Sequence, residues 1–127
     1  MRDILILKVG TKNLMTDDRF DQDFFNDIAR QVMAVQRGGK KVLIVSSGAI
    51  QAGRERMNDL GFKLRHFTKK DLAGIGARHL LNRWGEAFAC YGKEVSQFWL
   101  TYANWQNAEE IKSIKAGIAN CFNGGLV

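Results

Sequence analysis

The strongest constraint in this sequence is a β-branched run that ends in two serines and a glycine. Residues 42–45 follow a glycine pair and lead into Ser46-Ser47-Gly48, which predicts a buried strand that turns directly into a helix. An earlier apolar run over residues 3–9 predicts another buried strand. A helix between these two strands would make them a parallel pair with a right-handed crossover. The expected fold class is therefore α/β with a parallel sheet.

The connecting helix is indicated by its periodicity and by both of its ends. Apolar side chains recur at spacings of three, four and seven, at Phe24, Phe25, Ile28, Val32 and Val35. Asp21 and Asp23 favour a helix start, and Gly38-Gly39 favours a stop just after Arg37. The sequence thus predicts an amphipathic helix over residues 21–37.

The rest of the chain continues the alternation of helices and strands. We expect an irregular excursion over residues 58–68, a long helix over 72–91, a third strand over 93–100 and a helix over 105–122. Residues 126–127 are apolar and follow a second glycine pair, which is how a fourth strand would open. The chain is therefore expected to stop where a strand should begin.

Composition fits one globular domain. The 127 residues are 46% hydrophobic and 25% charged, and no linker or repeat divides them, so we expect one unit spanning 1–127 and no second domain. No run of eighteen apolar residues and no signal peptide is present, so a cytoplasmic location is expected and a membrane is not. Cys90 and Cys121 lack CxxC spacing and are interpreted as reduced thiols, so no metal site is indicated.

The net charge of +6 favours anionic ligands in general. Lysine and arginine are dense between Arg54 and Arg83, which raises nucleic acid as a possible partner. No recognised nucleic-acid motif accompanies these residues, so nucleic acid is not the expected ligand. Salt-sensitive retention on DNA or RNA would distinguish this alternative.

The first candidate loop leaves the first predicted strand. Lys8 stands at the strand end and is followed by Gly10 and Thr11, so an ammonium group can neutralise phosphate oxygens while glycine lets the backbone approach them. A lysine at a strand end is also an ordinary solvated boundary. No Gly-Lys-Ser/Thr follows, so a Walker-type loop is unsupported. Residues 10–13 are expected to form a polar, flexible loop. Asp17 and Asp18 follow it and are interpreted as loop solvation and helix entry, with an approach to a metal or to substrate as the alternative.

The second candidate loop, Ser46-Ser47-Gly48-Ala49, lies at the strand-to-helix junction. Free backbone N–H groups and the helix dipole favour a carboxylate or phosphate at such a junction. A serine that caps the helix is the plainer interpretation, and the two are compatible. Covalent serine catalysis is unsupported because the sequence has no GxSxG elbow. Both loops follow parallel strands and are expected at the edge of the sheet where ligands collect.

Four segments of the chain, in order, carry a family resemblance. KVGTKNL, from Lys8, is similar to the opening KVGSSxL, and VLIVSSGAIQAGRERM is similar to VxLVSSGAIAAGRExL almost residue for residue. LAGIGARHLLNRWGEAF resembles LAAxGQxxLxxxYxxxF, and VSQFWLT, which ends at Thr101, resembles VAQxLLT. These patterns are those of the amino acid kinase family and, within it, of the glutamate 5-kinases.

The resemblance implies a parallel-sheet αβα sandwich of the amino acid kinase type, apparently truncated after the third strand and its following helix. Residues 1–127 would be its amino-terminal, amino-acid-substrate half. The implied reaction is ATP-dependent phosphorylation of the γ-carboxylate of L-glutamate, the first step of proline biosynthesis, with ATP and Mg²⁺ as cofactors. Lys8 is the implied catalytic residue. The implied contacts are Lys8, Gly10 and Thr11 for the ATP phosphates, and Ser47, Gly48 and Ala49 for glutamate.

Several positions depart from the family pattern. Ala77 replaces a glutamine, Tyr102 an arginine and Asn104 an aspartate, and the chain ends before the family's PIINEND motif. The isolated chain is therefore expected to be inactive. An unpaired strand edge and the oligomeric habit of the family favour a homo-oligomer or a missing carboxyl-terminal half as partner. Another acid-specific kinase of this family, or a decayed non-catalytic interaction module, remain alternatives.

Overall fold

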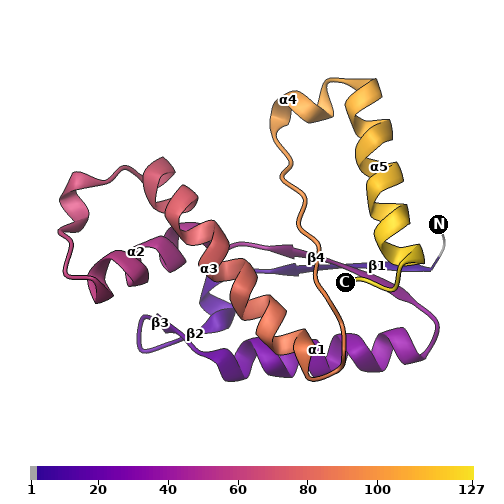
Figure 1. Cartoon of the computed structure of the whole chain (residues 1–127), viewed down its shortest axis with the longest axis horizontal. Coiled ribbons are helices and arrows are strands. Elements are labelled where there is room, and N and C mark those ends of the chain that lie inside the picture. The colour runs from indigo at the N-terminus through magenta and orange to yellow at the C-terminus, as the bar shows by residue number, and fades with distance from the viewer. Residues whose placement is uncertain (1–2) are drawn as a thin grey trace.

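The predicted strand-helix-strand unit organises the structure. The computed structural model describes residues 3–127, and Figure 1 shows its elements. Strand β1 (Ile4–Val9) and strand β4 (Lys41–Ser46) pair in parallel along their whole lengths, and helix α1 (Gln22–Arg37) connects them. The α/β class with a parallel sheet is confirmed.

Helix α1 begins and ends within one residue of the predicted bounds. The Asp21 carboxylate accepts a hydrogen bond of 2.9 Å from the Asp23 N–H, which satisfies a free donor of the first turn. At the other end the Gly38 N–H donates to the Val35 carbonyl at 3.1 Å. The start signal at Asp21 and the stop signal at Gly38 therefore act as expected.

A short ordered ribbon occupies the region predicted to be a flexible loop. The 3₁₀ helix η1 (Thr11–Leu14) leads into strand β2 (Met15–Thr16), which pairs antiparallel with strand β3 (Arg19–Phe20). Asp17 and Asp18 form the turn between β2 and β3 with φ angles of 50° and 60°, the left-handed conformation of two-residue hairpin turns. The expected loop is therefore replaced by a 3₁₀ helix over Thr11–Leu14 and by a hairpin whose polar turn joins two paired strands.

Two helices that pack against each other follow β4. Helix α2 (Ala49–Asp59) starts directly after the Ser-Ser-Gly turn. Helix α3 (Lys69–Ala89) follows an irregular stretch, as expected, which contains one 3₁₀ turn, η2 (Leu64–His66). Helix α3 begins three residues earlier than predicted because Thr68 and Asp71 form a capping box.

The contact between α2 and α3 depends on two glycines. A Cβ atom at Gly76 of α3 would overlap the carbonyl oxygen of Ala49 and the nitrogen of Gly53. A Cβ atom at Gly53 would in turn overlap the carbonyl oxygen of Leu72. These neighbours are backbone atoms that cannot swing aside, so the two helix backbones touch directly. Helix α3 thereby fixes the direction of α2.

The prediction of a third strand over residues 93–100 is wrong. This irregular segment is the orange trace that rises from the end of α3 in Figure 1. One step of parallel pairing does form: the Val127 N–H donates to the Glu94 carbonyl at 3.1 Å, and the Ser96 N–H donates to the Val127 carbonyl at 2.9 Å. The expected opening of a fourth strand is thus present, but a pairing of one step does not make the ladder that a strand requires.

The carboxyl-terminal helices complete a second layer. Helix α4 (Tyr102–Trp105) is a single turn, and helix α5 (Ala108–Asn123) begins three residues later than predicted. The reason is Asn107, whose side chain accepts hydrogen bonds from the first N–H groups of α5. No helix within residues 3–127 is long and apolar enough to cross a lipid bilayer.

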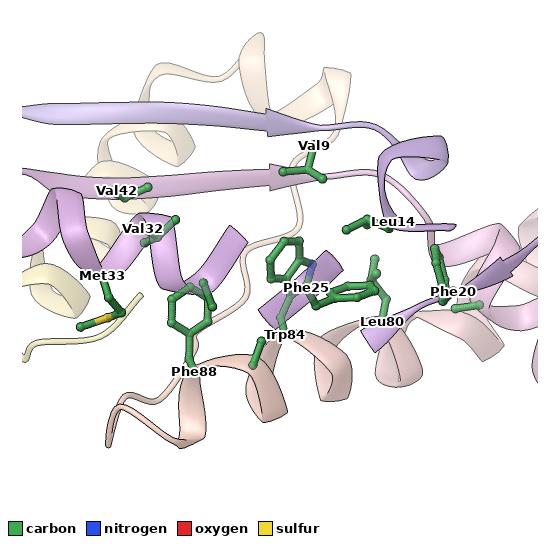
Figure 2. Close-up of a cluster of buried hydrophobic side chains, with 13 residues drawn as sticks. Val9, Leu14, Phe20, Phe25, Val32, Met33, Val42, Leu80, Trp84 and Phe88 are labelled. Carbon is green, nitrogen blue, oxygen red and sulfur yellow. The ribbon is translucent and has the colours of Figure 1, made fainter. Parts of the chain in front are cut away.

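The main hydrophobic core lies between the sheet and helices α1 and α3 (Figure 2). Phe25 and Phe88 are completely buried, and the Trp84 ring meets the Phe25 ring edge-on with centroids 4.8 Å apart. Helix α5 lies over the opposite face of the sheet, above a cavity of about 500 Å³ (Figure 1). That face stays partly open, because Ile6 and Val45 are 64% and 48% exposed.

The glycine contact gives a prediction for stability. Gly76→Ala should lower the free energy of unfolding by about 3 kcal/mol or more, because the new methyl group meets backbone atoms in a tightly packed contact. Gly74→Ala is the matched control in the same helix, where a Cβ meets nothing within 4 Å. The control should stabilise the chain by up to about 1 kcal/mol, the helix propensity gained. Urea unfolding measures both, and equal values for the two variants would contradict the direct backbone contact.

A second prediction concerns His79 of α3. Burial, followed by the positive charges of Arg78, Arg56 and Arg83, lowers the pKa of His79 below its usual value. A histidine with a lowered folded pKa is protonated more readily in the unfolded chain, so stability is lost as the pH falls below about 6.5. His79→Gln should reduce the loss of unfolding free energy between pH 7.5 and pH 5.5, measured in urea. An unchanged loss would contradict the assignment.

Candidate functional site

The two candidate loops meet at one edge of the sheet. The parallel register places Lys8 beside Val45 and Val9 beside Ser46 at the carboxyl ends of β1 and β4. The Ser47 N–H then donates to the Val9 carbonyl at 2.9 Å, one step beyond the last pair. The loop that begins after Val9 and the loop that begins after Ser46 therefore start from hydrogen-bonded neighbours.

Lys8 is exposed and has no salt-bridge partner within residues 3–127. By the alternation of a strand it lies on the same face of β1 as Ile6, the face that is open to solvent. A cavity of about 170 Å³ lies beside it, lined also by Asn13 and Gln31. The ammonium group is therefore available to an anion at this edge.

Gly10 and Thr11 lie where the chain turns into η1. The Asn13 N–H donates to the Gly10 carbonyl at 3.1 Å, which closes the 3₁₀ turn. Gly10 has a φ of −79°, and a Cβ there would make only an ordinary contact of 3.6 Å with the Asn13 side chain. Neither the backbone nor the packing requires glycine at this position.

Gly48 is the residue that shapes the second loop. Its φ of 125° is a conformation that residues with a side chain rarely adopt. A Cβ at this position would also lie 2.9 Å from the Phe20 ring. Gly48, and neither serine, is the N-cap of α2, so the interpretation of a serine cap is wrong.

The first turn of α2 consequently keeps its backbone donors free. The N–H groups of Ala49, Ile50 and Gln51 have no hydrogen-bond acceptor within residues 3–127, and no acidic side chain lies in this turn. The Ser47 hydroxyl is exposed and likewise makes no hydrogen bond within the described part of the chain. Free donors and the positive end of the helix dipole make this a place for a carboxylate or a phosphate.

Ser46 has a structural role. Its hydroxyl accepts a hydrogen bond of 3.0 Å from Trp84 Nε1 and donates one of 3.0 Å to the Ser47 carbonyl. Trp84 thus ties α3 to the base of the loop. The sequence indicated Trp84 only as a buried apolar position of a helix, because periodicity reveals burial but not the partner of an indole N–H.

The three departures from the family pattern have different surroundings. Ala77 is half-buried on α3, and Tyr102 is 91% exposed on α4. Asn104 accepts hydrogen bonds from the Thr101 N–H and hydroxyl and donates one of 2.7 Å to Glu110, so it caps and braces α4. Asn104 also lines the cavity under α5, together with the first residues of β1, and so lies toward the opposite end of that strand from Lys8.

Side chains that could bind a metal ion are dispersed in the described part of the chain. Within residues 3–127 no group of three or more histidine, cysteine, aspartate or glutamate side chains is placed to hold a metal ion. Asp17 and Asp18, the acidic pair that follows the Lys8 loop in the sequence, are exposed at the turn of the hairpin. The site as described offers donors and positive charge to an anion and no carboxylate cluster to a cation.

Known proteins resemble this chain over nearly its whole length. A sequence profile of the amino acid kinase family matches residues 3–127. The chain is 31% identical to a glutamate 5-kinase of Methanococcoides burtonii, over 97% of this chain and 33% of that protein. It is 35% identical to a glutamate 5-kinase of Thermus thermophilus, again over 97% of this chain and 33% of that protein.

Other relatives give the same result. The chain is 32% identical to a glutamate 5-kinase of Desulfotalea psychrophila, over 96% of this chain and 33% of the relative. The chain therefore spans about a third of the length of the curated relatives that it matches. The resemblance to glutamate 5-kinases is confirmed, and with a profile match over residues 3–127 the chain belongs to the amino acid kinase family.

Proposed function

We propose that this chain supplies the acid-substrate part of a kinase that transfers the γ-phosphoryl group of ATP to the γ-carboxylate of L-glutamate, the first step of proline biosynthesis. The observation that carries the proposal is that Lys8 and the free N–H groups at the start of α2 lie at the same edge of the sheet. The similarity to proteins named glutamate 5-kinase supports glutamate as the acid. Residues 1–127 would form the amino-terminal half of the kinase domain.

Ser47, Gly48 and Ala49 are proposed to bind the glutamate substrate. The Ser47 hydroxyl and the free N–H groups at the start of α2 are donors that suit a carboxylate. Gly48 shapes the turn that presents these donors, because residues other than glycine rarely adopt its φ of 125°. The start of α2 would therefore orient one anion by fixed backbone dipoles.

Lys8, Gly10 and Thr11 are proposed to contact the phosphates of ATP. The reaction brings two anions together, so it needs positive charge and alignment more than a strong base. The γ-carboxylate of glutamate is already ionised at neutral pH and requires no deprotonation before attack. Lys8, which has no salt-bridge partner within residues 3–127, would neutralise charge on the transferred phosphoryl group and is the proposed catalytic residue.

ATP and Mg²⁺ are the proposed cofactors. The free donors and the Lys8 ammonium fit phosphate oxygens. The described carboxylates do not fit a metal site, so no residue of this chain is assigned to Mg²⁺. The remaining ligands and the nucleotide pocket are proposed to come from a polypeptide that corresponds to the other part of the relatives' length. The cytoplasm, where ATP is available, is the proposed location, and the free edge of β1 makes self-association the proposed state.

The first test joins this chain to about the last two thirds of the Thermus thermophilus glutamate 5-kinase, the part that the match leaves out. The fusion should make acyl phosphate from glutamate and ATP, measured as hydroxamate. In it, Lys8→Ala should lower kcat, and Ser47→Ala should raise the KM for glutamate, with kcat/KM reduced about 10²-fold in each case.

Two exposed residues of the same types serve as controls for this test. Lys112→Ala and Ser113→Ala, both in α5, remove a lysine and a serine away from the proposed contacts. They should leave kcat/KM within about twofold. An active fusion in which Lys8→Ala and Ser47→Ala behave like these controls would remove the proposed roles and favour a non-catalytic interaction module.

The isolated chain provides a second test. The proposal places the nucleotide pocket and the Mg²⁺ ligands on another polypeptide, so the isolated chain should give no glutamate- and ATP-dependent hydroxamate above a blank without protein. Turnover by the 127-residue chain alone would contradict the proposal that another polypeptide must complete the site.

A further inference from the structure

Glu55 of α2 is a buried carboxylate to which the proposed reaction gives no role. It is 7% exposed, and it is the one charged residue that is buried among residues 3–127. A buried charge is costly unless it is hydrogen-bonded or paired, so its partners indicate what it is for. Resting on the proposed function, we infer that Glu55 is a positioning residue, which holds the β2–β3 hairpin so that Phe20 supports the Gly48 turn of the substrate loop.

Both carboxylate oxygens of Glu55 have partners. Oε1 accepts a hydrogen bond of 2.6 Å from the Phe20 backbone N–H, and a longer one of 3.4 Å from the Gln51 side chain. Oε2 lies 3.8 Å from the Arg83 guanidinium of α3. The short bond to a backbone donor is the strongest of these contacts, because an ionised acceptor shortens and strengthens a hydrogen bond. Glu55 therefore fixes the position of the Phe20 backbone.

Glu55 is the central member of a row on α2 that fastens the hairpin. Gln51 and Asp59 lie one turn before and one turn after it, on the same side of the helix. The Gln51 side chain donates to the Asp18 carbonyl at 3.0 Å, and Asp59 accepts two hydrogen bonds of 3.1 Å from Arg19. A ribbon with two residues in each strand has little stability of its own, so α2 determines where it lies.

Phe20 carries the position of the hairpin to the substrate loop. Its ring fills the space where a Cβ of residue 48 would be, with 2.9 Å between that Cβ position and the ring atom Cζ. The ring is fixed by an edge-on contact with Phe25 at 5.6 Å and by the Arg83 guanidinium 5.6 Å from its centre. Figure 2 shows Phe20 at one end of the core, beside Leu80, the other side chain near Gly48.

These contacts form a closed path, which leaves α2 at Glu55, runs through Phe20 of the hairpin and returns to Gly48 at the start of α2. Helix α2 presents its free N–H groups from Ala49, and six residues later its Glu55 side chain holds the hairpin that supports Gly48, the residue before Ala49. Glu55 does not itself reach substrate, since it is buried and its oxygens face Phe20 and Arg83. Its shortest hydrogen bond acts on the loop through Phe20, which separates its role from that of Ser47.

Nuclear magnetic resonance of the ¹⁵N-labelled 127-residue chain tests this inference. In Glu55→Ala the Phe20 amide should lose its protection from hydrogen exchange, and the Ser47 and Gly48 amide resonances should shift. Glu55→Gln keeps an oxygen acceptor for the Phe20 N–H and should restore both signals toward those of the unmodified chain. Asp59→Asn is the matched control on the same row, and should leave the Gly48 resonance unchanged because Asp59 bonds to the exposed Arg19 side chain of β3 and not to the Phe20 backbone.

Titration with L-glutamate supplies the functional readout. The apparent dissociation constant, followed at the Ser47 and Gly48 amides, should rise about tenfold or more in Glu55→Ala and return to within about threefold in Glu55→Gln. If the unmodified chain shows no glutamate response, the proposed substrate fails, while the unliganded Gly48 and Phe20 signals still decide the role of Glu55.

Three outcomes would overturn the inference. One is an unshifted Gly48 amide in a folded Glu55→Ala variant. Another is a Glu55→Gln variant that is folded but shows the changes of Glu55→Ala, since the hydrogen bond to Phe20 would then not be the cause. If Glu55→Ala does not fold, Phe20→Leu tests the next step of the path, because it keeps an apolar side chain but removes the ring atom nearest Gly48. A Gly48 resonance that does not move in Phe20→Leu would be the third.

Discussion

The parallel pairing of β1 with β4 is the interaction on which the rest of this structure depends. The connection between the two strands places α1 on one face of the sheet. The hydrogen bond from the Ser47 N–H to the Val9 carbonyl, one step beyond the last pair, brings the two loops together. Without that register Lys8 and the start of α2 would not share an edge. The candidate site is thus a product of backbone pairing, and the side chains that line it would only select its ligand.

Much of the fold could be predicted because its signals are local. Strands β1 and β4, helix α1 and the turn at Ser46-Ser47-Gly48 follow from apolar runs, caps and glycine stops, and they appear where expected. The segment over 93–100 has strand-like alternation but finds a partner only at Val127, so no ladder forms. The hairpin after η1 was missed for the opposite reason, since its polar sequence looks like a loop and its order comes from contacts with α2.

The candidate site divides in the same way. Lys8, Ser47 and Gly48 stand out in the sequence because they interrupt apolar runs at strand ends, and they are brought to one edge. The residues that support them do not stand out. In the sequence Glu55 is an ordinary charged residue of a helix, and Phe20 is an isolated aromatic residue in a polar stretch. Their contact is not visible there, because the two residues lie 35 positions apart in the chain.

The glycine contact between α2 and α3 has a consequence for the thermal motion of the site. A helix held by long side chains can shift as those side chains change rotamer, whereas backbone atoms in direct contact have no rotamers to exchange. Gly53 and Gly76 place such a contact within two turns of the free N–H groups of α2. The direction in which these dipoles point should therefore vary little as the molecule fluctuates, and a bound anion would find its donors already aligned.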